Sequence, residues 1–216
     1  MQHPKIFLLF VTFFLAGTLP VNAQRINGGL KFGVSRTTFT GNLAAGETAW
    51  ESISGLAGGV TIELRVFRGF SLVGEVLYLR MGAKTRVQYN NFPGDLTSRS
   101  SYLSIPALAQ LRLGESGTIR PRIFIGGAAL FVLESAILVE SRVDRQIFIE
   151  EDDSIESLDY GLMAGLGVDL HLASQRFTLE TRYYGGQNDV TKTSSQTGEA
   201  TVLNNQGWTI MTGVLF

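Results

Sequence analysis

The sequence predicts an all-β fold, an eight-stranded antiparallel up-and-down transmembrane β-barrel, on three observations. Eight stretches alternate apolar and other residues with the two-residue period of a β-strand. Tight turns and long polar connections alternate strictly between these stretches. Aromatic residues gather near both ends of the strands, as they do where a barrel meets the two membrane interfaces.

The first 23 residues have the pattern of a secretory signal peptide. Lys5 supplies a positive start, residues 6–19 form a short apolar run, and Val21-Asn22-Ala23 is a small-residue cleavage site. No later stretch approaches the 18 uninterrupted apolar residues of a membrane helix. We therefore expect export, cleavage after Ala23, and one barrel domain over residues 24–216.

Composition excludes several classes of site. The chain has no Cys, which rules out disulfides and thiolate metal sites. Its 18 Lys and Arg balance 19 Asp and Glu, so nothing in the net charge favours a nucleic-acid partner. We expect no cofactor and no metal.

The first four stretches place an apolar row opposite a row of glycine and polar residues. Residues 28–39 read GGLKFGVSRTTF and residues 55–67 read GLAGGVTIELRVF. Residues 70–87 begin in the same way, but the alternation blurs near Gly82, where we expect a bulge. In residues 102–113, YLSIPALAQLRL, Pro106 cannot donate to a strand ladder and indicates a local irregularity.

The last four stretches complete the set. Residues 122–135, RIFIGGAALFVLES, are nearly all apolar, so their facing is undecided from the sequence. Residues 158–172, LDYGLMAGLGVDLHL, give one unbroken apolar row and one row of small and polar residues. Residues 177–184, FTLETRYY, and 207–216, GWTIMTGVLF, follow, and the chain ends on an aromatic residue.

The connections between the stretches are of two kinds. Tight hairpins are expected around 68–69, 115–117 and 173–175. The long connections are residues 40–54, 88–101, 136–157 and 185–206, of which 136–149 could extend strands above the membrane. Both termini then lie on the short-turn side. Bacterial outer-membrane barrels have this plan, with short periplasmic turns and longer extracellular loops.

The polar row distinguishes a membrane barrel from a soluble, lipocalin-like barrel, which would turn its apolar row inward. This row is rich in glycine and carries isolated charges of both signs, which suits the crowded interior of a narrow barrel. We predict a charge network in the lumen, formed by Glu63, Arg65, Glu75, Arg112, Asp169, Glu180 and Arg182. A packed network is the preferred interpretation; a narrow proton or ion path is the alternative.

Two aromatic girdles are predicted at the membrane interfaces. The residues at the short-turn end are Phe67, Phe70, Phe177 and Phe216. The residues at the long-loop end are Tyr102, Tyr160, Tyr183 and Trp208.

Several of these segments together resemble a known family. The runs GLKFGVS, ELRVFRGFSLVGEVLYLRMGAK, YLSIPALAQLRL, DYGLMAGLGVD, TRYYGG and TGVLF are similar to the PorT-like outer-membrane β-barrel family of Bacteroidota, over essentially the whole mature chain. The resemblance implies a Gram-negative outer membrane and admits a role around secretion machinery.

The last strand also resembles the signal read by the outer-membrane insertion machinery. Thr209, Val214 and Phe216 fit its polar, apolar and aromatic positions, and Met211 stands where a glycine is usual. We therefore expect that machinery to be a partner during assembly.

Residues for catalysis are scarce, since the mature chain has no Cys and a single histidine, His171. We expect no enzyme. Residues 148–156 carry a dense acidic set that could bind calcium or bridge divalent ions to lipopolysaccharide phosphates: Glu150, Glu151, Asp152, Asp153 and Glu156. Their spacing lacks the ligand order and glycine turn of a calcium loop, so a solvated loop is the preferred interpretation.

The expected function is structural or interactive, in a barrel with a largely plugged lumen. Expected partners are membrane lipid, lipopolysaccharide, and an unknown protein met at the surface loops. The alternative is a narrow porin-like channel for small solutes or ions.

Overall fold

The computed structural model describes residues 26–41, 50–89, 92–114, 117–141, 147–151, 157–172, 175–188 and 203–216. Its strands are β1 (Ile26–Gly41), β2 (Glu51–Phe67), β3 (Phe70–Tyr89), β4 (Phe92–Arg112), β5 (Ile119–Ser141), β6 (Ile147–Glu151), β7 (Leu158–Leu172), β8 (Gln175–Gly186) and β9 (Leu203–Leu215). No helix among the described residues is long and apolar enough to cross a membrane. The predicted signal peptide lies outside the described residues.

Eight of the strands close into one antiparallel barrel. The sheet runs β4-β3-β2-β1-β9-β8-β7-β5, and β4 pairs with β5 to close it, while β6 pairs only with β5 outside the barrel. The termini meet where β1 pairs β9, and the backbone N–H of Phe216 donates to the carbonyl of Gly28 at 2.9 Å. The predicted eight-stranded, up-and-down barrel is therefore confirmed.

The strand register sets the width of the interior. Pairs followed from Lys31 through β2, β3, β4 and β5 arrive at Asp159 on β7. Pairs followed the other way, through β9 and β8, arrive at Asp169, so the strands are staggered by ten residues (169 against 159). An eight-stranded barrel has an interior just wide enough for side chains to fill it.

The apolar rows face outward. On β7, Leu162 is 62% and Leu166 59% exposed, whereas Asp159 and Asp169 on the opposite row are buried. The other barrel strands share this inversion, which is the reverse of a soluble barrel. Closure of the barrel also pairs the backbone groups at the sheet edges. This pairing is required in the hydrocarbon core of a membrane, where each unsatisfied N–H or C=O group costs several kcal/mol.

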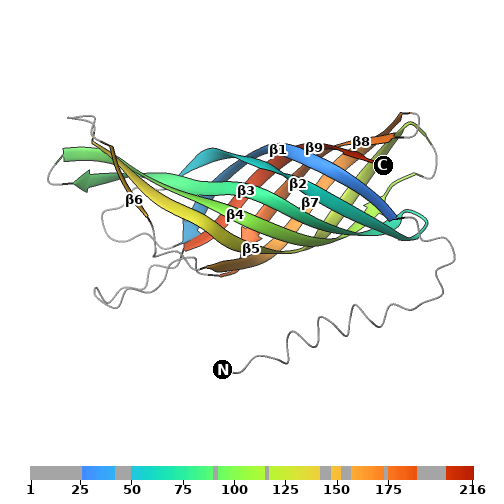
Figure 1. Cartoon of the computed structure of the whole chain (residues 1–216), viewed down its shortest axis with the longest axis horizontal. Helices are drawn as coiled ribbons and strands as arrows, with labels where there is room; N and C mark the ends of the chain where they lie inside the picture. Colours follow the sequence, from blue (N-terminus) through green and yellow to red (C-terminus); the bar gives the residue numbers. More distant parts are fainter. Residues whose placement is uncertain are drawn as a thin grey trace, which may run out of the picture.

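Three neighbouring strands are far longer than a membrane crossing needs. β3, β4 and β5 have 20, 21 and 23 residues, whereas roughly 9 to 11 suffice. On β3 the outward apolar side chains end at Tyr78 and an exposed Arg80 follows; on β4 an exposed Arg99 lies opposite Gly82. About ten residues of each strand therefore project past the apolar belt, and Figure 1 shows these ends and β6 extending beyond the other strands at the left.

This projection corrects one prediction and confirms another. The predicted loop 88–101 is mostly strand, because β3 continues to Tyr89 and β4 begins at Phe92. The Lys84–Asp95 ion pair (3.1 Å) and continued backbone pairing hold this hairpin, so its polar composition reflects exposure above the membrane and not a loop. The predicted extension of strands into residues 136–149 is confirmed by β5 and β6.

A bulge lies close to Gly82, as predicted, and the irregularity predicted at Pro106 takes another form. A bulge in β2 between Ser52 and Ala57 lies opposite Ala83 and Leu79, on either side of Gly82. At Pro106 the register is continuous, and β4 and β5 instead shift register at Ser101/Tyr102. On the β3 side the ladder has no pairs at Ile105 and Pro106, where the missing proline N–H interrupts it without shifting the register, so the predicted local irregularity is present and is not a bulge.

Candidate functional site: the filled lumen

Nine charged side chains meet in the half of the lumen nearest the short turns. Each is no more than 7% exposed. They are Lys31, Glu63, Glu75, Arg112, Arg122, Asp169, Arg176, Glu180 and Arg182. This set is called the charge network below.

Two carboxylates and two cations form the centre of the charge network. Lys31 Nζ lies 2.6 Å from Glu75 Oε1 and 3.1 Å from Glu180 Oε2. Arg182 Nη1 donates to Glu75 Oε2 at 2.5 Å, and Arg182 also pairs with Glu180. Because β1, β3 and β8 supply these groups, the cluster ties strands across the barrel as well as within the sheet.

A second cluster lies closer to the short turns. Arg112 Nε donates to Asp169 Oδ2 at 2.7 Å, and Arg112 Nη2 lies 2.5 Å from Glu63 Oε2. Arg176 pairs with Glu63, and Ser71 Oγ donates to Glu63 Oε1 at 2.9 Å. Every carboxylate here therefore faces cations, which is the condition under which buried charge is tolerated.

Arg122 joins the two clusters. Its Nε lies 2.9 Å from Asp169 Oδ1 and its Nη2 2.5 Å from Glu180 Oε2. Gln110 Oε1 accepts a further hydrogen bond from Nη1 at 2.7 Å. Phe124 packs beside it, with the Arg122 Cζ 5.8 Å from the ring centroid, a cation–π distance. The nine charges thus form one continuous network.

An apolar layer lies on the loop side of the charge network. Along β3 the inward side chains change from Glu75 to apolar residues, and along β5 they change from Arg122 in the same direction. The layer consists of Leu77, Leu79, Met81, Leu130, Met163 and Met211. All of these except Leu130 line a void of about 10 Å³, together with polar side chains such as Ser104 and Thr209, and this volume is near the smallest that holds one water.

A third, polar layer follows toward the loops. Asn205 Nδ2 donates to Tyr102 Oη at 3.2 Å and to Asp159 Oδ2 at 3.0 Å. Tyr184 is buried at 3% exposure on the neighbouring strand β8. Above this layer Trp50 packs edge-on against Phe39, with ring centroids 5.2 Å apart. The lumen is therefore filled in successive layers.

The structure brings six of the seven predicted lumen charges together and leaves out one. Arg65 is half-buried at the short-turn mouth and has no carboxylate partner among the described residues. The strand ends there, so the alternation that points Arg65 inward does not place it within the barrel.

Three members of the charge network were missed from the sequence. Lys31 lies on the inward row of β1, where its place between Gly29 and Gly33 was an available signal. Arg122 begins a stretch whose facing was undecided, and Arg176 lies one residue before the predicted strand. Side-chain alternation alone could not assign these two.

The aromatic residues at the short-turn end lie on the outer surface of the barrel, where two of them stack on each other. The rings of Phe67 and Phe70 stack with centroids 4.8 Å apart, and Phe216 is 68% exposed. Phe177 is also exposed. These side chains lie where the short-turn girdle was predicted.

At the loop end the prediction needs one correction. Tyr160 and Trp208 are exposed, and Tyr183 packs on Trp208 at 5.2 Å between ring centroids. Tyr102 is only 1% exposed and belongs to the polar layer inside the lumen, so its assignment to the girdle was wrong. Its position on the inward row of β4 decides its facing, and Asn205 satisfies its hydroxyl.

The predicted acidic loop is only partly described. The backbone of Glu150 and Glu151 lies in β6 and pairs with β5, so these two positions are strand and not loop. Asp152, Asp153 and Glu156 lie outside the described residues. Among the residues that the structure describes, no group of three or more His, Asp or Glu side chains could hold a metal ion.

Comparison with known proteins gives a matching family and solved structures of similar fold. The family model described as outer membrane protein beta-barrel domain matches residues 22–192. The outer membrane protein OprG of Pseudomonas aeruginosa has a TM-score of 0.53 and 14% identity, over 89% of this chain and 97% of that one. Neisserial surface protein A has a TM-score of 0.45 and 13% identity, over 88% and 97%. No curated protein sequence matches significantly.

Proposed function

The chain belongs to the outer membrane protein beta-barrel domain family, and from this premise we propose that it is a non-conducting outer-membrane barrel that acts through its loop end. The observation that carries the proposal is the filled lumen. A charge network, an apolar layer and a polar layer succeed one another along the barrel axis. The working surface is then the part of the barrel that projects outside the membrane.

The charge network and the apolar layer would block solutes in different ways. The charge network holds its guanidinium groups and carboxylates at 2.5 to 3.2 Å in most pairs, leaving each ion's charge matched by its neighbours. The void in the apolar layer is lined mainly by apolar side chains such as Leu77, Leu79 and Met163, and stripping an ion of water there costs several kcal/mol even after relaxation. A permeating ion would have to break the first layer and dehydrate in the second.

The projecting sheet supports an interaction role. β3, β4, β5 and β6 form a continuous sheet beyond the apolar belt, and β3, β4 and β5 continue from it into the barrel. An edge strand such as β6 offers backbone hydrogen-bonding groups to a partner strand. A rigid strand extension also presents a contact surface at lower entropic cost than a flexible loop. We propose that a protein partner docks here.

Two finer proposals accompany this role. The resemblance to the PorT-like family of Bacteroidota supports a position near secretion machinery, with the outer-membrane insertion machinery as a transient partner. The lipid-facing belt and its aromatic girdles support contact with membrane lipid and lipopolysaccharide. We propose no catalytic role, because the lumen charges are engaged with one another.

The rival function is a narrow channel for small solutes or ions. The observation in its favour is that inward charges extend over much of the lumen. Each carboxylate in the charge network is nevertheless held by at least two cations, which makes these charges poor candidates for mobile binding sites.

Site-specific photo-crosslinking in the native outer membrane tests the interaction role. A photoreactive residue replaces Thr97, on the projecting part of β4, and a matched one replaces Leu111, in the apolar belt of the same strand. We expect discrete protein adducts from position 97 and lipid adducts alone from position 111. Identical adducts from both positions would contradict a partner at the loop end.

A further inference from the structure

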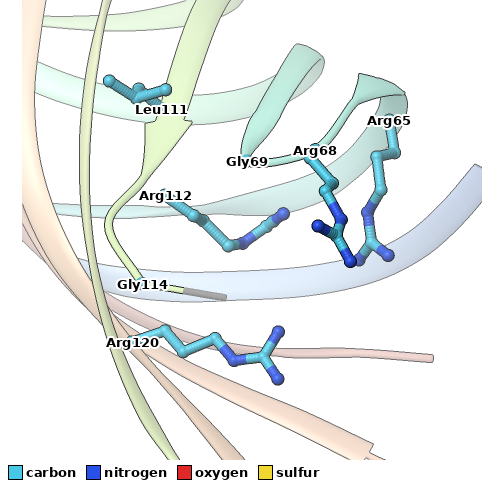
Figure 2. Close-up of a pocket in the computed structure, with 7 residues that line it drawn as sticks. All are labelled: Arg65, Arg68, Gly69, Leu111, Arg112, Gly114 and Arg120. Atoms are coloured by element: carbon cyan, nitrogen blue, oxygen red, sulfur yellow. The ribbon is translucent and has the colours of Figure 1, made fainter. Parts of the chain in front are cut away.

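A cavity opens at the short-turn mouth of the barrel and borders the charge network at Arg112. Its volume is about 520 Å³, which falls in the range of small-molecule sites. It is lined by Arg65, Arg68, Gly69, Leu111, Arg112, Gly114 and Arg120. Figure 2 shows the four arginine side chains extending into one space. None of these lining residues is acidic.

The charge balance leaves this mouth positive. The charge network holds five cations against four carboxylates, so it has no spare negative charge for its surroundings. Arg112 is already paired with Glu63 and Asp169. Arg65 and Arg120 have no carboxylate partner among the described residues, and Arg120 Nε donates instead to the Gly117 carbonyl at 3.2 Å. A cleft of one charge sign with low-dielectric walls concentrates ions of the opposite sign.

The backbone at the mouth orients these side chains. β2 and β3 shift register between Arg65 and Phe67, and such bulges re-aim a side chain at a barrel rim. The turn that follows needs Gly69 at φ 77°, a left-handed conformation that favours glycine. A Cβ on Gly69 would also lie 3.1 Å from the Arg112 carbonyl oxygen. The arginines therefore stand on a defined turn and strand ends.

We propose that this mouth is an anion site that takes phosphate groups. A guanidinium is planar, always charged and matches the oxygens of a phosphate with two parallel N–H donors. Arg65 and Arg120 supply guanidinium groups that have no carboxylate partner among the described residues, and Arg112, held by Glu63 and Asp169, forms part of the inner wall. By the family's topology the short turns face the periplasm, so the ligand comes from that side.

Two sources offer this phosphate chemistry. One is a soluble phosphorylated compound of the periplasm, and the other is the headgroup of an anionic phospholipid in the inner leaflet. The stacked Phe67 and Phe70 rings beside the turn place the mouth near that interface. This site lies at the opposite end from the proposed partner surface, so the two proposals stand or fall separately.

The first arm of the experiment tests for a soluble ligand and uses inorganic pyrophosphate as the probe. The refolded full-length mature barrel in detergent is titrated calorimetrically, together with the double variant Arg65→Gln/Arg120→Gln. The control is Arg99→Gln, an exposed arginine on the projecting part of β4. We expect the pyrophosphate Kd to rise at least tenfold in the double variant and to stay unchanged in the control. A heat-modifiable gel band confirms that each variant is folded.

The second arm of the experiment tests for a lipid ligand and uses nanodiscs of mixed phosphatidylglycerol and phosphatidylcholine. Native mass spectrometry counts the phosphatidylglycerol molecules that the released barrel retains. Loss of retained phosphatidylglycerol in the double variant alone assigns the site to a lipid phosphate, and loss of pyrophosphate binding alone assigns it to a soluble one. Absence of binding in both arms, or equal binding by wild type and double variant, overturns the proposal.

Discussion

The two halves of the lumen are filled by different chemistry. Toward the short turns, nine buried charged side chains form ion pairs with one another, with distances such as 2.7 Å between Arg112 Nε and Asp169 Oδ2. Toward the loops, Leu77, Leu79 and Met163 pack around a void of about 10 Å³. Both halves share the same strands and the same ten-residue stagger.

The two kinds of filling contribute differently to the stability of the barrel. An ion pair specifies its partner by charge and geometry, so the charge network favours one strand register over others. Apolar side chains pack without such directional demands and exclude water. A buried network is strongly destabilised when one partner is lost, whereas a packed layer loses stability in proportion to the volume removed. The substitutions below separate these behaviours.

Removal of one carboxylate from the charge network should have the largest effect. Glu180 contacts Lys31, Arg122 and Arg182, so Glu180→Gln leaves three buried cations with reduced compensation. We expect the free energy of unfolding to fall by about 3–5 kcal/mol. Urea titration in lipid vesicles, followed by tryptophan fluorescence, measures it. Glu134→Gln, at an exposed site, is the control and should change it by less than about 0.5 kcal/mol.

Truncation in the apolar layer should cost somewhat less. Leu130 is fully buried, and Leu130→Ala should lower the free energy of unfolding by about 2–4 kcal/mol through lost contacts and a new cavity. The same titration reports it. Leu133→Ala, at a side chain 54% exposed on the same strand, should cost clearly less, and equal costs would contradict a packed interior.

A glycine beside the charge network offers a smaller effect. A Cβ on Gly165 would lie 2.4 Å from Phe124 Cζ and 2.4 Å from the Thr181 carbonyl oxygen. Gly165→Ala should therefore destabilise the barrel by about 1–3 kcal/mol through overpacking. At Gly127 the nearest atom would be 3.6 Å away, so Gly127→Ala should be nearly neutral in the same experiment. A neutral Gly165→Ala would mean that the Phe124 ring is loosely held.

The loop-end girdle should give the smallest effect. Tyr183 and Trp208 pack with ring centroids 5.2 Å apart, and Tyr183 Oη donates to Gln206. A double-mutant cycle with Tyr183→Ala and Trp208→Ala should give a coupling of about 0.5–1.5 kcal/mol. Unfolding followed by circular dichroism measures it, since one tryptophan is removed. Zero coupling would show that each ring contacts lipid independently.

Alternation was enough to predict the barrel, its closure and the facing of most strands. It placed Glu75 and Arg182 inward, and the structure pairs them at 2.5 Å. Alternation does not give the position of a residue along the barrel axis, so it could not distinguish Arg65 at the mouth from Glu63 inside the lumen.

Other features depend on contacts that a single sequence does not encode locally. Tyr102 was assigned to the girdle for its residue type, but its inward row and Asn205 place it in the lumen. The layered order of charges and apolar side chains follows from the ten-residue stagger, which is a property of the closed sheet. The strand extension at 88–101 was hidden because exposed strands above a membrane have the composition of loops.

Planar-bilayer conductance of the refolded 24–216 chain tests the closed lumen most directly. A heat-modifiable gel band first confirms that the barrel is folded, and the same recording is made for Glu75→Gln. We expect no discrete conductance steps from the folded wild-type barrel. Discrete wild-type steps whose size changes when Glu75 is neutralised would contradict the closed lumen and establish a channel.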